Sequence, residues 1–553
     1  MTTPLAVRPG RVGRPKSKTG CDTCKSVFLN NSTSFSTHKS TRARRVRCGE
    51  EKPQCLRCSS TGRQCSYSLN STPTRNLKKT ESPQQQIALY SHQGSRERRA
   101  FEYYFYKAGP ALSGVLDLAF WRGSVLQICR MEPAIWDAII SLSSLYERPP
   151  IYEVSPFRLI SNPAEVEHSY HREALVWYSR SLAVVQQRID RGDADLTVCL
   201  ISCILFIAIE LLQGNRRGAL NLCTQGVQMM KTTLRRASGS MGAVSSKAFI
   251  DGAFLIPVVK PIFRRLDTWA LITDGTSKAD WSFDPDPVNM QVTSIDEARN
   301  VLCNIVTDMK SLNIETKRHW NLSAESRANN ILDLASQRNF LKNKLNHWHQ
   351  SFTSLPNVDR DSGGTALLLM TFMSVSIEID TCLDPNQMTY DKFEAEFTQI
   401  INYATTAISS TRSPEGSQPR FMFEVGVFLP LFITALRCRH PHIRRRALQH
   451  LHEAPPTQGV FMCVPAAHAV AVLVALEEDP ATALNISGIE EVLSRPGCIP
   501  PAQNRIWEFN VSSDNDPEGR TRNWLHYSLQ DFYDIKDGLK FIQNVVLFPG
   551  AQS

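Results

Sequence analysis

The hydrophobic positions of the chain recur mostly at helical spacing. One apolar stripe, at steps of three and four residues, consists of Leu175, Tyr178, Leu182, Val185 and Ile189. It predicts an amphipathic helix that ends near residue 190. Similar stripes predict helices over 366–382, 395–409, 421–437, 444–451 and 463–476. Alternating strand patterns are scarce, so the chain from Phe101 onward is predicted to be all-α.

The longest apolar run, residues 196–209, is 14 residues long and ends at Glu210. It is shorter than the roughly 18 to 20 residues of a membrane-spanning helix, so we expect a buried helix. The short turn Gly214–Gly218 joins it to a second helix that begins near Ala219, which predicts an antiparallel pair. Loops are expected near 237–249, 273–292 and 511–522, and the absence of a secretory signal indicates an intracellular chain.

Composition divides the chain into four parts. These are a basic arm (1–20), a cysteine-rich segment (21–67), a polar, flexible linker (68–95) and an all-α region (96–550). The first 100 residues carry 20 Lys and Arg but 5 Asp and Glu, whereas the remainder carries 42 and 48. This concentration of positive charge suits a polyanion such as DNA.

The cysteine-rich segment predicts a metal site. The candidate ligands are Cys21, Cys24, Cys48, Cys55, Cys58 and Cys65. A Cys-x2-Cys pair presents two sulfurs from one turn, and six thiolates satisfy two tetrahedral ions only if two sulfurs are shared. The expected cofactor is therefore two Zn²⁺. Buried thiols without a metal are expected for Cys129, Cys199, Cys203, Cys223, Cys303, Cys382, Cys438, Cys463 and Cys498.

The sequence around these cysteines resembles the fungal Zn2Cys6 family. The residues that carry the resemblance are Gly20-Cys-Asp-Thr-Cys-Lys25, Arg44-Arg-Val-Arg-Cys48, Lys52-Pro-Gln-Cys55-Leu-Arg-Cys58 and Gly62-Arg-Gln-Cys65. The resemblance implies that Cys21 and Cys55 bridge the two zinc ions. It implies that Cys24 and Cys48 complete one ion, and Cys58 and Cys65 the other.

The resemblance also implies a DNA-reading element between the second and third cysteines. It assigns base recognition to Arg44 and Arg45, whose guanidinium groups can bond O6 and N7 of guanine in CGG-like half-sites. Phosphate contacts are expected from Lys25, Arg42, Arg47, Lys52, Arg57 and Arg63. The expected partners are double-stranded DNA and the transcription machinery or co-regulators, in the nucleus. We read the basic arm as a nuclear-import signal rather than a minor-groove hook.

One segment departs from the family pattern. Cys24 and Cys48 enclose 23 residues, whereas the family has six, an excess of 17 that lies at about 26–42. One hypothesis is a retained intron of 51 nucleotides. The alternative is a true loop extension, which still permits zinc binding but weakens DNA binding. His38, in this segment, is expected to be a loop histidine rather than a ligand.

The helical region resembles the fungal-specific transcription factor domain, which implies a regulatory role. The motifs are Ala100-Phe-Glu-Tyr-Tyr-Phe, Pro110-Ala-Leu-Ser-Gly, Glu210-Leu-Leu-Gln-Gly214, Phe263-Arg-Arg-Leu-Asp267 and Pro430-Leu-Phe-Ile-Thr. There is no Walker loop, nucleophile elbow, His-Glu-x-x-His or dinucleotide fingerprint, so we expect no enzyme. His168 and His171 are expected on a solvated helix face. A cationic patch beside Cys438 and His440 is expected from Arg437, Arg439 and Arg444–Arg446.

The predicted function is that of a zinc-dependent, sequence-specific transcription factor for RNA polymerase II genes. The alternative is a helical interaction protein whose interrupted cluster no longer binds DNA. A metal-using enzyme is disfavoured, because a zinc ion held by four thiolates has no open position for water. No heptad repeat follows Cys65, so monomeric binding and a homodimer formed by the helical region both stay open. No membrane partner is expected.

Overall fold

The computed structural model describes most of the helical region and a short part of the cysteine-rich segment. The described residues are 51–52, 54–60, 94–150, 166, 168–239, 256–274, 292–320, 322, 324–356, 358–384, 387–483, 485–515, 521–530 and 541–549. The chain divides into two compact units, residues 1–86 and 87–553, and each is described by itself.

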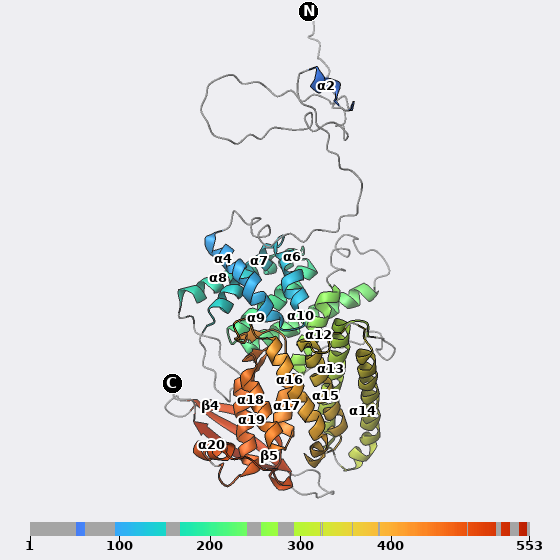
Figure 1. The fold of residues 1–553 in the computed structure, drawn as a ribbon, viewed down its shortest axis with the longest axis vertical. Coiled ribbons are helices and arrows are strands. Elements are labelled where there is room, and N and C mark those ends of the chain that lie inside the picture. Colours follow the sequence, from blue (N-terminus) through green and yellow to red (C-terminus); the bar gives the residue numbers. More distant parts are fainter. Residues whose placement is uncertain are drawn as a thin grey trace, which may run out of the picture. The chain divides into compact units, whose positions relative to one another are not determined.

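The second unit is built predominantly from helices (Figure 1). They are α4 (Ser95–Tyr103), η1 (Tyr104–Ala108), α5 (Gly109–Ser113), η2 (Ala119–Ser124), α6 (Val125–Cys129), α7 (Pro133–Glu147), α8 (Ser169–Arg191), α9 (Leu196–Leu212), α10 (Arg216–Gly239), α12 (Ile256–Asp274), α13 (Ile295–Trp320), α14 (Ala324–Thr353), α15 (Gly363–Thr381), η4 (Gln387–Phe393), α16 (Glu394–Ser410), α17 (Phe428–Arg437), α18 (Pro441–Glu453), α19 (Cys463–Glu478), α20 (Ile486–Ser494) and η5 (Ala502–Asn504). The all-α prediction is confirmed for the bulk of this unit, and two small sheets accompany the helices.

Helix α9 is the buried centre of the first half of this unit. Its residues are apolar on all sides and nearly all buried, and it packs against α7, α8 and α10. The carboxylate of Asp195 caps its first turn by accepting a hydrogen bond from the Val198 amide at 3.0 Å. The buried helix predicted from the apolar run is therefore confirmed. Gly214, at φ 75°, makes the left-handed turn that leads into α10.

Helix α8 confirms the predicted helix but not all of the predicted stripe. Tyr178 is buried, whereas Leu182 and Ile189 are 37% and 48% exposed. The buried face consists of Ala174 and Tyr178 with the polar Ser181, whose hydroxyl donates to the Ala134 carbonyl at 2.6 Å. The small polar Ser181, rather than the neighbouring Leu182, therefore contacts α7.

Helices α12 to α17 form the second half of the core. Helix α13 packs against α12, α14 and α15, and α15 also packs against α16 and α17. Helix α15 has the length and apolar composition of a membrane-spanning helix, but 61% of its most apolar window is buried within the protein. These neighbours make α15 a core helix of the bundle.

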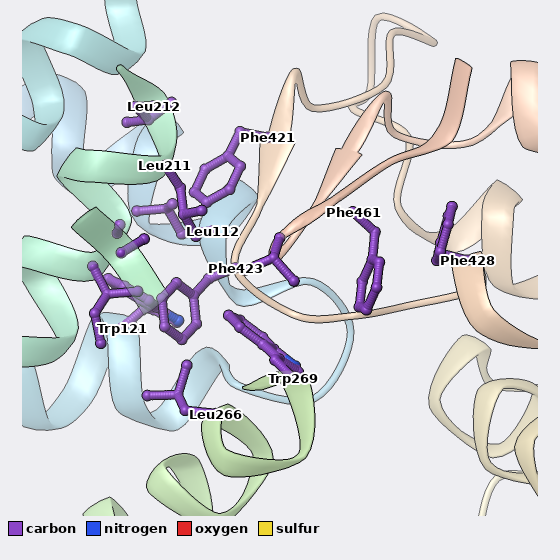
Figure 2. Close-up of a cluster of buried hydrophobic side chains, with 14 of the residues drawn as sticks. Leu112, Trp121, Leu211, Leu212, Leu266, Trp269, Phe421, Phe423, Phe428 and Phe461 are labelled. Atoms are coloured by element: carbon purple, nitrogen blue, oxygen red, sulfur yellow. The ribbon is translucent and has the colours of Figure 1, made fainter. Parts of the chain in front are cut away.

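A small three-stranded sheet lies where these two halves meet. Strand β1 (Phe421–Met422) pairs in parallel with β2 (Thr457–Gln458), which pairs in the antiparallel direction with β3 (Phe461–Met462). Figure 2 shows Phe423, just after β1, between Trp121 and Trp269, with ring centroids 5.2 and 5.3 Å apart. The helix predicted over 421–437 is wrong at its start. The first two residues form β1, whose backbone pairs with β2, and α17 begins only at Phe428.

The C-terminal part is an antiparallel sheet, which the sequence did not predict. Its strands are β4 (Ile506–Asn515), β5 (Thr521–Gln530) and β6 (Phe541–Pro549), in that order. The expected loop over 511–522 is wrong over the described residues, which lie at the ends of β4 and β5. Phe509 pairs with Tyr527, and Val511 with Leu525, so one apolar face is continuous across the two strands.

This apolar face packs on the helices that precede it in the chain. Its cluster joins Ile506 and Leu525 to Leu473 and Leu476 of α19 and to Val492 of α20. The strands of this sheet need a packing partner for their apolar side chains, and α19 and α20 provide it.

Candidate zinc and DNA-binding site

The described part of the cysteine-rich segment is a tight turn that carries two of the predicted zinc ligands. Cys55 precedes the short helix α2 (Leu56–Ser59), and Cys58 lies within it. The Cys58 amide donates to the Cys55 carbonyl at 3.0 Å and to the Cys55 sulfur at 3.4 Å. Both cysteines are buried, whereas Leu56 between them is 67% exposed.

This turn has the properties that a zinc ligand pair requires. A backbone amide that donates to sulfur favours the thiolate, which is the form that binds metal. The Leu56 amide donates to the Glu51 carboxylate at 3.0 Å, which holds the entry to α2. Two sulfur donors withdrawn from solvent within one turn match the chemistry of Zn²⁺, so Cys55 and Cys58 fit as ligands.

The other predicted site residues lie outside the described residues. They are Cys21, Cys24, Cys48 and Cys65 among the ligands, and Lys25, Arg44, Arg45 and Arg47 among the DNA contacts. The structure therefore brings together one Cys-x2-Cys pair of the predicted cluster. Among the described residues, no group of three or more His, Cys, Asp or Glu side chains is placed to hold a metal ion.

Several minor predictions for the helical region need correction. His168 is exposed, but His171 is buried, because α8 turns that side of the helix toward the core. Cys303 and Cys382 are half-buried and Cys498 is exposed, so three of the nine remaining cysteines are not buried thiols.

The cationic patch expected at 437–446 is wrong for its two central arginines. Arg439 and Arg444 are 1% and 0% exposed, and both form ion pairs with Glu477 of α19, at 2.9 and 2.5 Å. Glu477 also accepts a hydrogen bond from the Ile506 amide at 2.7 Å. We call Arg439, Arg444 and Glu477 the closed network.

Opposing electrostatic effects set the protonation of the closed network. Burial raises the pKa of Glu477, but Arg439 and Arg444 outweigh burial and leave that pKa below its ordinary value. Burial lowers the pKa of Arg439 to about 10, against the opposite effect of Glu477. Glu477 and Arg439 are therefore both charged at neutral pH.

A second charge network, which the sequence did not indicate, lies between the two halves of the helical core. Arg299 of α13 donates to both carboxylate oxygens of Asp117, at 2.6 and 3.0 Å, and to Glu424 at 2.7 Å. Arg265 of α12 donates to Asp117 at 2.8 Å. We call Asp117, Arg265, Arg299 and Glu424 the cavity network, because all four line one cavity.

The pKa values of the two acids of the cavity network shift in opposite directions. Burial raises the pKa of Asp117, but Arg265 and Arg299 outweigh it and leave the pKa below its ordinary value. For Glu424 burial dominates, with a contribution from Asp117, and its pKa stays above the ordinary value despite Arg299. The one sequence signal for this network is an acid within an apolar stretch, as in Leu116-Asp-Leu and Phe423-Glu-Val.

Comparison with known proteins addresses the cysteine-rich segment directly. Residues 41–74 match the model of the fungal Zn(2)-Cys(6) binuclear cluster domain. The chain is also similar to the aspercryptin biosynthesis cluster-specific transcription regulator atnN of Emericella nidulans, with 24% identity over 294 residues. Both similarities support a fungal Zn2Cys6 transcription factor.

The extent of these similarities is limited. The alignment with atnN covers 47% of this chain and 41% of atnN, so it spans less than half the length of that relative. An alignment of this length exceeds the region before α4 and therefore includes part of the helical region. No solved structure matches the chain.

The matched range divides the predicted cluster. It contains Cys48, Cys55, Cys58 and Cys65 together with Arg44, Arg45 and Arg47, but it begins after Cys21, Cys24 and Lys25. The match begins within the last two residues of the extra segment 26–42.

Proposed function

We propose that this Zn2Cys6 protein is a zinc-dependent, sequence-specific DNA-binding transcription factor that regulates RNA polymerase II genes in the nucleus. Arg44 and Arg45 read CGG-like half-sites, and Lys25 and Arg47 contact phosphate. Two Zn²⁺ ions are held by Cys21, Cys24, Cys48, Cys55, Cys58 and Cys65. The observation that carries the proposal is the family match over 41–74, within which Cys55 and Cys58 form the buried turn.

Zinc content provides the first test. The full chain is purified, and its bound zinc is measured together with DNA binding before and after chelation. Six participating cysteines give two zinc ions per chain, whereas Cys48, Cys55, Cys58 and Cys65 alone suffice for one tetrahedral ion. Retention of full DNA affinity after complete zinc removal would contradict the proposal.

DNA selectivity provides the second test. Binding of the full chain to a duplex with two CGG half-sites is compared with binding to a scrambled duplex, at a fixed salt concentration. Replacing Arg44 and Arg45 with alanine should remove most of the preference while leaving weak, salt-sensitive binding. The matched control is replacement of Arg75 and Lys78, which follow the family match. Equal binding of both duplexes by the zinc-loaded chain would rule out sequence-specific recognition.

A second candidate function is favoured by where the family match begins. Because Cys21 and Cys24 fall outside 41–74, the chain that contains residues 26–42 is alternatively a helical interaction protein that no longer binds DNA. The full chain is compared with a chain that lacks residues 26–42. Zinc-dependent DNA binding by the shortened chain alone would assign DNA reading to the spliced product and the second function to the longer one.

A further inference from the structure

One cavity of the helical region combines apolar walls with six charged side chains and three hydroxyl groups. It has a volume of about 120 Å³ and lies among α12, α13, α15, α17 and the segment 423–426. Trp269 and Phe423, whose rings lie side by side in Figure 2, are among the residues that line it. Because the lining residues Ile272, Val306 and Leu429 are only half-buried, the cavity reaches the surface.

The volume sets the size of a possible ligand. A dry cavity of roughly 150 Å³ with aliphatic and aromatic walls holds benzene. The cavity described here is slightly smaller, so the part of a ligand that it encloses is no larger than about a benzene ring. Apolar walls alone, however, would not select among such molecules.

Arg265 supplies the selectivity. Among the described residues its guanidinium makes one hydrogen bond, to Asp117 at 2.8 Å, whereas Arg299 makes three. A guanidinium has five N–H donors, so Arg265 retains donors that no described protein group accepts from. Its side chain is 16% exposed and lines the cavity.

The charges around the cavity decide what kind of group Arg265 can bind. The acids Asp117, Glu378 and Glu424 balance the bases Arg265, Arg299 and Lys310, and Lys310 is paired with Glu378 at 2.6 Å. The lining therefore does not require an ion. It does offer strong donors to an sp² oxygen, since hydrogen bonds from a cation are roughly twice as strong as neutral ones.

We propose that this cavity binds a compact apolar molecule that carries a carbonyl or carboxylate oxygen, with that oxygen accepting hydrogen bonds from Arg265. The apolar body contacts Trp269, Phe423 and the aliphatic residues of α13 and α15. This site is independent of the zinc cluster, so its test involves neither zinc nor DNA, and failure of either proposal leaves the other standing.

The test uses three probes of nearly equal shape on the full chain. Acetophenone carries a neutral carbonyl, benzoate carries a carboxylate, and α-methylstyrene replaces the oxygen with a methylene group. Binding is measured by ligand-observed NMR titration. At least one of the two oxygen probes should bind about tenfold or more tightly than α-methylstyrene, and the comparison of acetophenone with benzoate distinguishes a carbonyl from a carboxylate ligand.

Two variants assign the binding to this cavity. Arg265→Met should reduce the preference for oxygen to about twofold or less, and it leaves Asp117 paired with Arg299. Val306→Phe fills the cavity and should weaken all three probes. The control is Arg264→Met, on the same helix but outside the cavity lining. Equal binding of all three probes by the wild type, no saturable binding, or an unchanged preference in Arg265→Met would overturn the proposal.

Discussion

The closed network and the cavity network both bury arginines against carboxylates, but they do so with different surroundings. In the closed network one acid, Glu477, serves two arginines that are 1% and 0% exposed. In the cavity network two acids serve two arginines, and Arg265 keeps 16% of its side chain exposed. Removal of Glu477 therefore leaves both arginines of the closed network without a counter-charge. Removal of one acid from the cavity network leaves Arg299 paired with the other acid.

The pKa values of Glu477 and Glu424 differ for the same reason. Two arginines stabilise the charged form of Glu477, and its pKa falls below the ordinary value. Glu424 shares Arg299 with a second carboxylate, and its pKa rises instead. The charged form of Glu477 therefore contributes to stability, whereas the charged form of Glu424 costs stability.

The largest effect is expected from Glu477→Gln. This change leaves Arg439 and Arg444 buried without a counter-charge, which should lower the free energy of unfolding by about 3–5 kcal/mol. Chemical denaturation followed by circular dichroism measures the loss. The matched control is Glu478→Gln, because its partner Arg445 is 22% exposed and can reach water. A loss no greater than that of the control would show that the closed network does not depend on the charge of Glu477.

The second prediction concerns acid. Because the pKa of Glu477 is lower in the folded than in the unfolded chain, its stabilising contribution is present above the unfolded value and is lost as pH falls through the folded value. Each unit of difference corresponds to about 1.4 kcal/mol. The gap in unfolding free energy between wild type and Glu477→Gln should therefore narrow from about pH 7 to about pH 4. A gap that widens with acid would reverse the assigned direction.

The two networks also separate what the sequence predicts from what it does not. Helix α9 was predictable because its apolar residues lie within the helix itself. The turn at Cys55 and Cys58 was predictable because its spacing is local. The buried state of Arg439 depends on Glu477, which lies 38 residues further on, so the arginine-rich stretch resembles a solvated face. The C-terminal sheet was missed for the same reason, since its apolar face is completed only by α19 and α20.

The cavity was unpredictable on similar grounds. The four members of the cavity network come from four separate segments, and Arg299 pairs with both Asp117 and Glu424. Each acid by itself is an unremarkable polar residue in an apolar stretch. Only the tertiary structure shows that Arg299 pairs with two acids, whereas Arg265 pairs with one acid and lines the cavity.

A smaller effect is expected from Glu424→Gln. The amide oxygen can still accept from Arg299, and Arg299 keeps both bonds to Asp117, but the bond that Glu424 accepts from the Val115 amide is lost. Because the raised pKa means that the charged form of Glu424 costs stability as pH rises, removing that charge offsets part of this loss, and the free energy of unfolding should fall by less than about 2 kcal/mol. The measurement is the same denaturation at neutral pH. A loss equal to that of Glu477→Gln would erase the distinction between the two networks.

The smallest effect is expected for an ion pair outside both networks. Lys317 of α13 lies 2.6 Å from Glu508 of β4, but their side chains are 63% and 46% exposed. Water and salt screen such pairs, so Lys317→Ala should lower the free energy of unfolding by less than about 0.5 kcal/mol, and added salt should abolish even that. Denaturation at low and high salt measures both effects. A salt-resistant loss above about 1 kcal/mol would mean that Lys317 holds β4 on the bundle by packing of its aliphatic stem, and that exposure alone does not rank the ion pairs of this protein.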